Sequence, residues 1–132
     1  MDNTELIKQA ASVIATHKLG DRLIGDVGAA VVSEQGHVYL GTCIDTSGIG
    51  FCAEQSAIAA MVTAGEHKIK TVVATWKDEH GDVFVISPCG HCREFMRQAN
   101  DGDENIDIIL STDKTVKLSE LLAYRDSWEK VN

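Results

Sequence analysis

The segment that decides the fold is C-A-E-Q-S-A-I-A-A-M-V-T-A-G, residues 52–65. Its alanine content favours a helix, its apolar residues from Ala57 to Val62 recur at helical spacing, and Gly65 ends it. A second segment, P-C-G-H-C at residues 88–92, begins another stretch that we expect to be helical from about Cys89 to Asn100. Both segments therefore place cysteines at the N-terminus of a helix.

Three of the four cysteines, Cys52, Cys89 and Cys92, have the chemistry and spacing of metal ligands. Zinc takes thiolates in a tetrahedral array, and a C-x-x-C at a helix start places two sulfurs on one side of an ion. The free N–H groups and the positive end of the helix dipole favour the thiolate over the thiol. A second helix alongside brings Cys52 to the same point, which leaves the fourth position open, as in catalytic zinc sites. Glu54, in the first turn after Cys52, can reach a water in that position and carry its protons.

The rest of the chain shows alternating strand and helix patterns. The expected elements are a helix at 4–17 that Gly20 ends, a β-hairpin at 26–33 and 37–44, the helix at 52–65, strands at 69–76 and 83–86, the helix at 89–100, a strand at 106–110, an extended piece at 115–118 and a short helix at 119–124. Strands that alternate with helices predict a layered α/β fold with a largely shared sheet.

Composition excludes several classes of protein. The chain has 132 residues, so we expect residues 1–132 to form a single domain. Twelve Lys and Arg against 20 Asp and Glu give a net charge of −8, which disfavours nucleic acid polymers and membranes as partners. The N-terminus does not have the pattern of a signal peptide, and no apolar run is long enough to span a membrane. We therefore expect a cytoplasmic protein whose cysteines are reduced.

These motifs resemble the signature of the zinc-dependent cytidine deaminase superfamily, which pairs His or Cys-x-Glu with P-C-x-x-C. The resemblance covers most of the chain, through V-G-A-A at 27–30, G-T-C-I-D at 41–45, C-A-E-Q-S-A-I-A-A at 52–60 and S-P-C-G-H-C-R-E at 87–94. It implies a three-layer α/β/α sandwich with a central mixed sheet of about five strands. It also implies Zn²⁺ as the cofactor, with Cys52, Cys89 and Cys92 as its ligands.

The activity that the resemblance implies is hydrolytic deamination of a free cytidine-type nucleoside, a small-molecule substrate, to the uridine-type product and ammonia. Glu54 would be the catalytic residue that protonates ring nitrogen N3 and then the departing amine. Small members of the superfamily are typically homotetramers with residues of neighbouring subunits near each pocket, so we expect a homo-oligomer.

Some positions differ from the family's nucleoside-binding pattern. Gly25 stands where these deaminases usually have an aromatic residue that lines the pocket. Cys43 and Asp45 replace the Asn and Glu that hold the base and the ribose hydroxyls, and a thiol is only a weak hydrogen-bonding group. Cys43, Asp45 and Ala53 are therefore our candidate substrate-binding residues on the central part of the chain.

Two further residues follow from the resemblance. Trp128 lies in a tail that resembles the ending of the blasticidin S deaminase branch, where an aromatic tail helps to close the pocket. It is a candidate substrate-binding residue, and equally a candidate for a subunit interface. Many small cytidine deaminases have Arg where this chain has Gln55, so Arg93, directly after Cys92, is the cation expected to offset the negative charge of three thiolates around zinc.

Three alternative functions have to be weighed against deamination of a cytidine-type nucleoside. One is a deaminase for a blasticidin S-type aminonucleoside, and another is a non-catalytic zinc-stabilised binding protein. A structural zinc site that also used Cys43 would leave Glu54 without a role. An enzyme that edits DNA or RNA is disfavoured, because it needs a basic channel and stacking aromatics, whereas this chain is acidic and has two Trp, two Tyr and three Phe.

Overall fold

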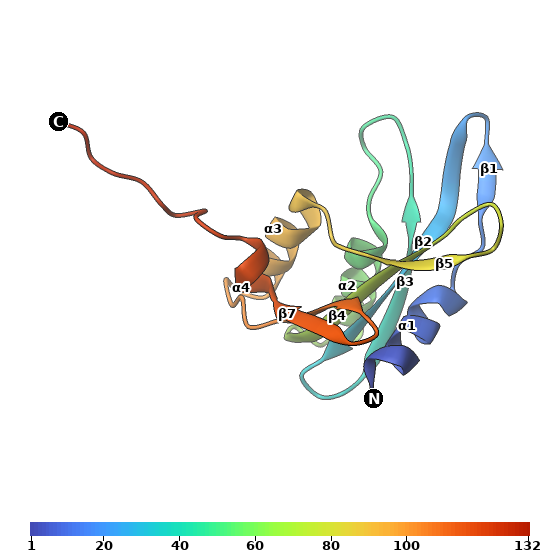
Figure 1. Ribbon diagram of the computed structural model, residues 1–132, viewed down its shortest axis with the longest axis horizontal. Helices are drawn as coiled ribbons and strands as arrows, with labels where there is room; N and C mark the ends of the chain where they lie inside the picture. Colours follow the sequence, from blue (N-terminus) through green and yellow to red (C-terminus); the bar gives the residue numbers. More distant parts are fainter.

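The computed structural model describes residues 1–132 and contains four helices and seven strands (Figure 1). In chain order the elements are α1 (Asn3–Ser12), β1 (His17–Leu19), β2 (Arg22–Ser33), β3 (Val38–Ile44), α2 (Ala53–Thr63), β4 (Ile69–Lys77), β5 (Val83–Ile86), α3 (Gly90–Ala99), β6 (Asp107–Ser111), β7 (Lys114–Lys117) and α4 (Leu118–Leu121). No helix combines the length and the apolar character needed to cross a bilayer.

The sheet is mixed and is centred on the antiparallel pair β2 and β4. β3 lies antiparallel on the other edge of β2, β6 runs parallel to β4, and β7 closes the far side antiparallel to β6. Ile24 of β2 pairs with β1 on one edge and with β3 on the other, so β1 shares the edge of β2 that β4 occupies. In the same way, β5 shares the edge of β4 with β6.

The expected sheet of about five strands is therefore correct for the principal positions, β3-β2-β4-β6-β7, and too small by the two short strands β1 and β5. The helix expected at 4–17 was too long. It ends at Ser12, because residues 17–19 pair with residues 22–24 of β2 as a hairpin. Gly20, with φ +62°, lies in the turn of that hairpin and does not end a helix.

The sheet lies between helices on both faces, which confirms the three-layer α/β/α fold. Alternate residues of a strand point to opposite faces. Ala29 and Val31 of β2 pack with α2 and α3 in one buried cluster. Ala30 and Val73 pack with Leu6 of α1 in a second cluster on the opposite face. The candidate cysteines belong to the α2–α3 layer.

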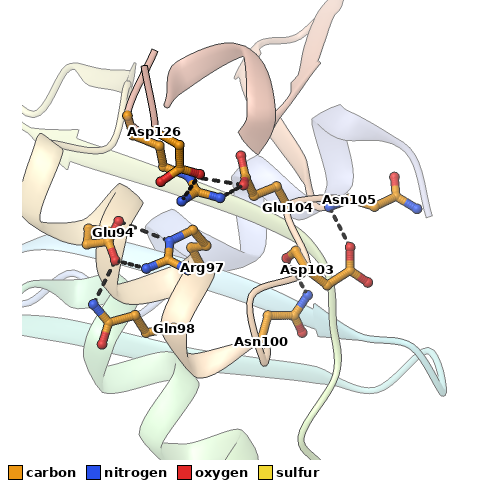
Figure 2. Close-up of polar contacts among 9 residues, drawn as sticks. Glu94, Arg97, Gln98, Asn100, Asp103, Glu104, Asn105 and Asp126 are labelled. Atoms are coloured by element: carbon orange, nitrogen blue, oxygen red, sulfur yellow. Dashed lines mark hydrogen bonds and ion pairs between the residues drawn. The ribbon is translucent and has the colours of Figure 1, made fainter. Parts of the chain in front are cut away.

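The second half of α3 and the loop after it are held by polar contacts (Figure 2). Arg97 pairs with Glu94 within the helix, and Arg125 pairs with Glu104 at the base of the C-terminal segment. Asn100 is fully buried and accepts the Ile69 N–H at 2.8 Å, while its amide donates to the Asp103 carbonyl at 3.0 Å. These bonds join the end of α3 to the start of β4. Beyond α4 the chain runs away from the body of the molecule (Figure 1).

Both helical layers rest directly on glycines of the sheet. A Cβ at Gly28 would lie 2.1 Å from the carbonyl oxygen of Ala10 in α1. A Cβ at Gly41 would lie 2.4 Å from the backbone nitrogen of Ala57 and 2.8 Å from the carbonyl oxygen of Ala53, both in α2. Since backbone atoms cannot turn aside as a flexible side chain can, Gly41 determines how closely α2 approaches β3.

We expect Gly41→Ala to destabilise the protein by about 3 kcal/mol, the upper part of the range for overpacking, because α2 must move away from the sheet. Urea denaturation followed by circular dichroism measures the change. Val62→Ala, on the exposed side of the same helix, is the control and is expected to cost less than about 1 kcal/mol. Equal stability of Gly41→Ala and wild type would contradict the packing described for α2.

Candidate metal centre and active site

Two helix N-termini form the metal centre. Cys52 is the N-cap residue of α2 and Cys89 the N-cap residue of α3, both with extended backbone, and Cys92 lies in the first turn of α3. The helices begin at these positions because the cysteines precede the apolar-periodic stretches and Pro88 disfavours a helical residue before it. The Sγ atoms of Cys52, Cys89 and Cys92 all lie within 4.8 Å of one another.

This donor set fits zinc. Zinc–sulfur bonds of about 2.3 Å in a tetrahedron require sulfurs about 3.8 Å apart, so small side-chain adjustments bring all three onto one ion. No other His, Cys, Asp or Glu joins the cluster. Three thiolates around Zn²⁺ leave one coordination position for a non-protein ligand, which is the arrangement of catalytic rather than structural zinc sites.

The ionisation of the three thiols shows why they need a cation. Burial raises the pKa of Cys52 and of Cys92, which is fully buried. Burial also acts to raise the pKa of Cys89, but hydrogen bonds from the Cys92 and His91 backbone N–H groups outweigh it and lower that pKa. Three negative charges in so small a volume repel one another, and a divalent cation removes this penalty as it displaces the protons.

Glu54 lies in the first turn of α2 and is only 4% exposed. It lines the same cavity of about 160 Å³ as the three cysteines, and burial raises the pKa of its carboxyl group. The other lining residues are Val27, Cys43, Ala53, Ile86 and Ser87. A buried carboxylate beside a three-cysteine metal centre is placed to exchange protons with a molecule in that cavity.

A second, more open cavity of about 340 Å³ adjoins the first and shares Cys43 and Cys52 with it. It is formed by the loop between β3 and α2, which Ile44 and Phe51 close with two backbone hydrogen bonds of 3.0 Å. Asp45 lines this outer cavity, whereas the fully buried Ala53 lines the inner one. No Lys, Arg or His side chain lines either cavity.

Cys43 stands at the junction of the two cavities and is held by residues that the sequence analysis did not single out. Its thiol donates to Asp26 Oδ1 at 3.2 Å, and the indole N–H of Trp76 donates to Asp26 Oδ2 at 3.1 Å. Trp76 stacks on Phe84 with ring centroids 5.7 Å apart. Burial raises the pKa of Cys43. The only sequence signal for this group was a charged residue, Asp26, at the start of the largely apolar stretch 26–33.

Arg93 lies beside the metal centre, but its hydrogen bonds go to oxygen atoms and none goes to a sulfur. The guanidinium donates to the Pro88 carbonyl at 2.7 Å, to the Leu121 carbonyl at 3.2 Å and to Ser87 Oγ at 3.1 Å. It therefore joins the loop that precedes Cys89 to α4.

The other two residues discussed from the sequence lie apart from the cavities. Trp128 is 93% exposed on the C-terminal segment and lines neither cavity of its own chain. His91, between the two cysteines of the C-x-x-C segment, is exposed, and its Nε2 lies 2.9 Å from Nε2 of Gln55. Gln55 also accepts the backbone N–H of Cys52 at 2.9 Å, so its side chain joins the starts of α2 and α3.

The three-layer sandwich and the three-cysteine centre define a zinc-binding α/β protein. The family model for the cytidine and deoxycytidylate deaminase zinc-binding region matches residues 1–106. The chain therefore belongs to the cytidine and deoxycytidylate deaminase family. Its membership and its cysteine cluster together establish Zn²⁺ as the cofactor.

Known proteins agree with this assignment. The chain is 34% identical over 102 residues to the cytidine deaminase of Shewanella sediminis, and 32% identical over 83 residues to that of Photorhabdus laumondii. These matches cover 74% and 60% of this chain, but only 31% and 25% of the relatives, so the chain corresponds to about a third of their length or less.

Solved structures of similar fold match almost end to end. The cytidine deaminase of Mycobacterium tuberculosis superposes with a TM-score of 0.74 at 25% identity, covering 93% of this chain and 95% of that one. The cytidine deaminase of Mycobacterium leprae gives a TM-score of 0.74 at 24% identity over 93% and 98% of the two chains, which shows the shared fold.

We expect Gln55→Leu to weaken zinc binding about tenfold, because the change removes the side chain that orients Cys52 relative to α3. Competition with a chromophoric chelator measures the zinc affinity of the folded protein. Gln98→Leu is the matched control, since Gln98 lies on α3 and bonds only to Glu94. Unchanged zinc affinity in Gln55→Leu would show that the helix starts are held by packing alone.

Proposed function

We propose that this chain is a zinc-dependent hydrolase that deaminates a free cytidine-type nucleoside to the uridine-type product and ammonia. The observation that carries the proposal is the convergence of the three Sγ atoms within 4.8 Å, with the buried Glu54 on the same cavity. Family membership and the activity named for the relatives support it.

In this proposal Cys52, Cys89 and Cys92 hold the zinc ion, which when bound acts as a Lewis acid and lowers the pKa of water to about 7. Glu54 accepts a proton as the water oxygen forms its bond to C4 of the ring, and delivers that proton to N3. It then transfers the second proton of the water to the exocyclic amine as the C4–N bond breaks, and ammonia leaves. Ala53 and Val27 form the apolar walls that hold the ring.

The charge of the cavity supports a nucleoside rather than a nucleotide as the substrate. The family includes deoxycytidylate deaminases, whose substrates carry a phosphate. Here neither cavity has a cationic side chain, while Asp45 lines the outer one and the chain has a net charge of −8. Anions bind where Lys, Arg or free N–H groups are present to receive them. Asp45 is suited instead to accept a hydrogen bond from a sugar hydroxyl.

Other features of the protein are proposed on the family resemblance. Arg93 holds the loop before Cys89, and its positive charge there offsets the negative charge of the thiolates. Trp128 either covers the pocket or enters a subunit interface. A homotetramer gives Trp128 and the exposed Ile49 and Phe51 apolar surroundings that they lack in one chain. We further propose that residues 1–132 are one domain and that the protein is cytoplasmic, in keeping with its four free thiols.

A blasticidin S-type aminonucleoside is the alternative substrate. The Trp128-Glu129 ending and the short loop that precedes Cys52 support it, as does the replacement of the family's Asn by Cys43. A screen of ammonia release over cytosine, cytidine, deoxycytidine, methylated cytidines and blasticidin S distinguishes the two substrate classes.

Glu54→Ala is expected to retain the fold and the bound zinc while ammonia release falls at least 1,000-fold, because the proton carrier is lost. Ammonia assays, circular dichroism and metal analysis test this together. Glu34→Ala, at an exposed turn, is the control and should match wild type. Full activity of Glu54→Ala would refute the role of Glu54, whereas an inactive wild type on the whole panel would favour a zinc-stabilised binding protein.

Deoxycytidine 5′-monophosphate is expected to be deaminated with a kcat/KM about 100-fold below that of deoxycytidine, because its phosphate meets carboxylates and no cation. Steady-state ammonia release provides the comparison. 5′-O-methyldeoxycytidine, which adds bulk without charge, is the control for size. A nucleotide used as well as the nucleoside would contradict the charge argument.

A further inference from the structure

The contact between Cys43 and Asp26 determines what the cavity presents to a substrate. Cys43 is the only residue besides Cys52 that lines both the inner and the outer cavity. A molecule that fills both cavities therefore lies against the Cys43 side chain. The hydrogen bond of this thiol therefore lies at the place where the two cavities meet.

The direction of that hydrogen bond follows from the chemistry of its partner. An ionised carboxylate has no proton to donate, so the bond of 3.2 Å between Sγ and Asp26 Oδ1 uses the thiol proton. The other carboxylate oxygen is taken by the Trp76 indole, whose ring is in turn stacked on Phe84. No Lys, Arg or His pairs with Asp26, so its two hydrogen bonds are to Cys43 and Trp76.

The backbone conformation of β2 allows Asp26 to make both hydrogen bonds. The register of β2 against β3 shifts between Ile24 and Gly28, and Gly25 has a φ of +78°, which residues with a Cβ rarely adopt. A Cβ at Gly25 would also lie 2.7 Å from the carbonyl oxygen of Ala15. The irregular strand lets one carboxylate reach Cys43 on β3 and Trp76 on β4 together.

From this geometry we infer that Cys43 is a specificity-determining residue and that Asp26 is its positioning residue. With its proton directed to Asp26, the thiol shows the cavity only a weakly accepting sulfur. The Cys43 side chain therefore contributes almost nothing to the binding of a sugar hydroxyl. The cavity accepts cytosine-type nucleosides that lack the hydroxyl group facing Cys43. The inference rests on the proposed function, since it concerns the substrate of that cavity.

A wall that hydrogen-bonds a hydroxyl discriminates strongly against the analogue that lacks it, whereas an apolar wall does not. Cys43→Asn introduces a donor and an acceptor, and should raise the preference for hydroxylated over deoxygenated sugars about tenfold. Cys43→Ala removes only the sulfur, and should leave that preference within about threefold of wild type. Asp26→Ala frees the thiol proton and should raise the preference for hydroxylated sugars about threefold. Asp26→Asn retains a hydrogen-bond acceptor for the thiol and should therefore leave this preference at the wild-type value.

The test is calorimetric binding of uridine, 2′-deoxyuridine and 2′,3′-dideoxyuridine to the zinc-loaded protein, since these products are not consumed. Ammonia release from the matching cytidines is measured in parallel. Trp76→Phe is the control that removes the indole donor but keeps the Cys43–Asp26 contact. If Cys43→Asn does not fold, Cys43→Ser serves instead, because its oxygen accepts a hydrogen bond from a hydroxyl; a rise of about fivefold is expected.

The outcomes distinguish failure of the inference from failure of the proposed function. Ammonia release by wild type without a shift in Cys43→Asn overturns the inference and keeps the proposed function. So does a tenfold loss of hydroxyl preference in Cys43→Ala, because the thiol would then be holding a hydroxyl. Binding with the expected shift but no ammonia release supports the inference and rejects the enzyme. Failure of every nucleoside to bind, together with no ammonia release from any of the cytidines, overturns both.

Discussion

The structure depends on bringing three thiols from two helix N-termini to one point. Cys52 begins α2 and Cys89 begins α3, so the two helices must lie on the same face of the sheet with their starts at the same end. The direct contact of α2 with Gly41 and the buried bonds of Asn100 at the end of α3 meet this requirement. Packing thus assembles three thiols that a divalent cation can convert to thiolates as it displaces their protons.

The electrostatics around this centre disfavour an anionic ligand. Burial raises the pKa of Glu54, Cys52 and Cys92, so the cavity disfavours isolated negative charge, and it has no cationic side chain to receive an anion. A neutral heterocycle fits these conditions better than a phosphate ester. The resident metal ion then provides the positive charge in the site.

In the proposed enzyme, the outer cavity departs from the family pattern while the inner cavity keeps it. Cys52, Glu54, Cys89 and Cys92 match the signature of the family, whereas the resemblance places Cys43 and Asp45 where the family has Asn and Glu. Asp26 engages the thiol proton of Cys43. In the proposed enzyme, catalysis and specificity therefore depend on different residues, because the three cysteines and Glu54 lie at the helix starts while Asp26 and Cys43 lie on β2 and β3.

By itself the sequence predicted where α2 and α3 begin, and it singled out the three cysteines and Glu54 that the structure brings to one cavity, because caps, short-range spacing and helical periodicity are local signals. It did not determine that residues 17–19 form a strand, that Asp26 contacts Cys43 and Trp76, or that Trp128 stands free of its own cavity. Those features depend on strand pairing and on contacts between residues that are far apart in the sequence. Asp26 and Cys43 are separated by 17 positions, and Asp26 and Trp76 by 50. Local sequence preferences do not predict contacts between distant residues, so only the tertiary structure could decide them.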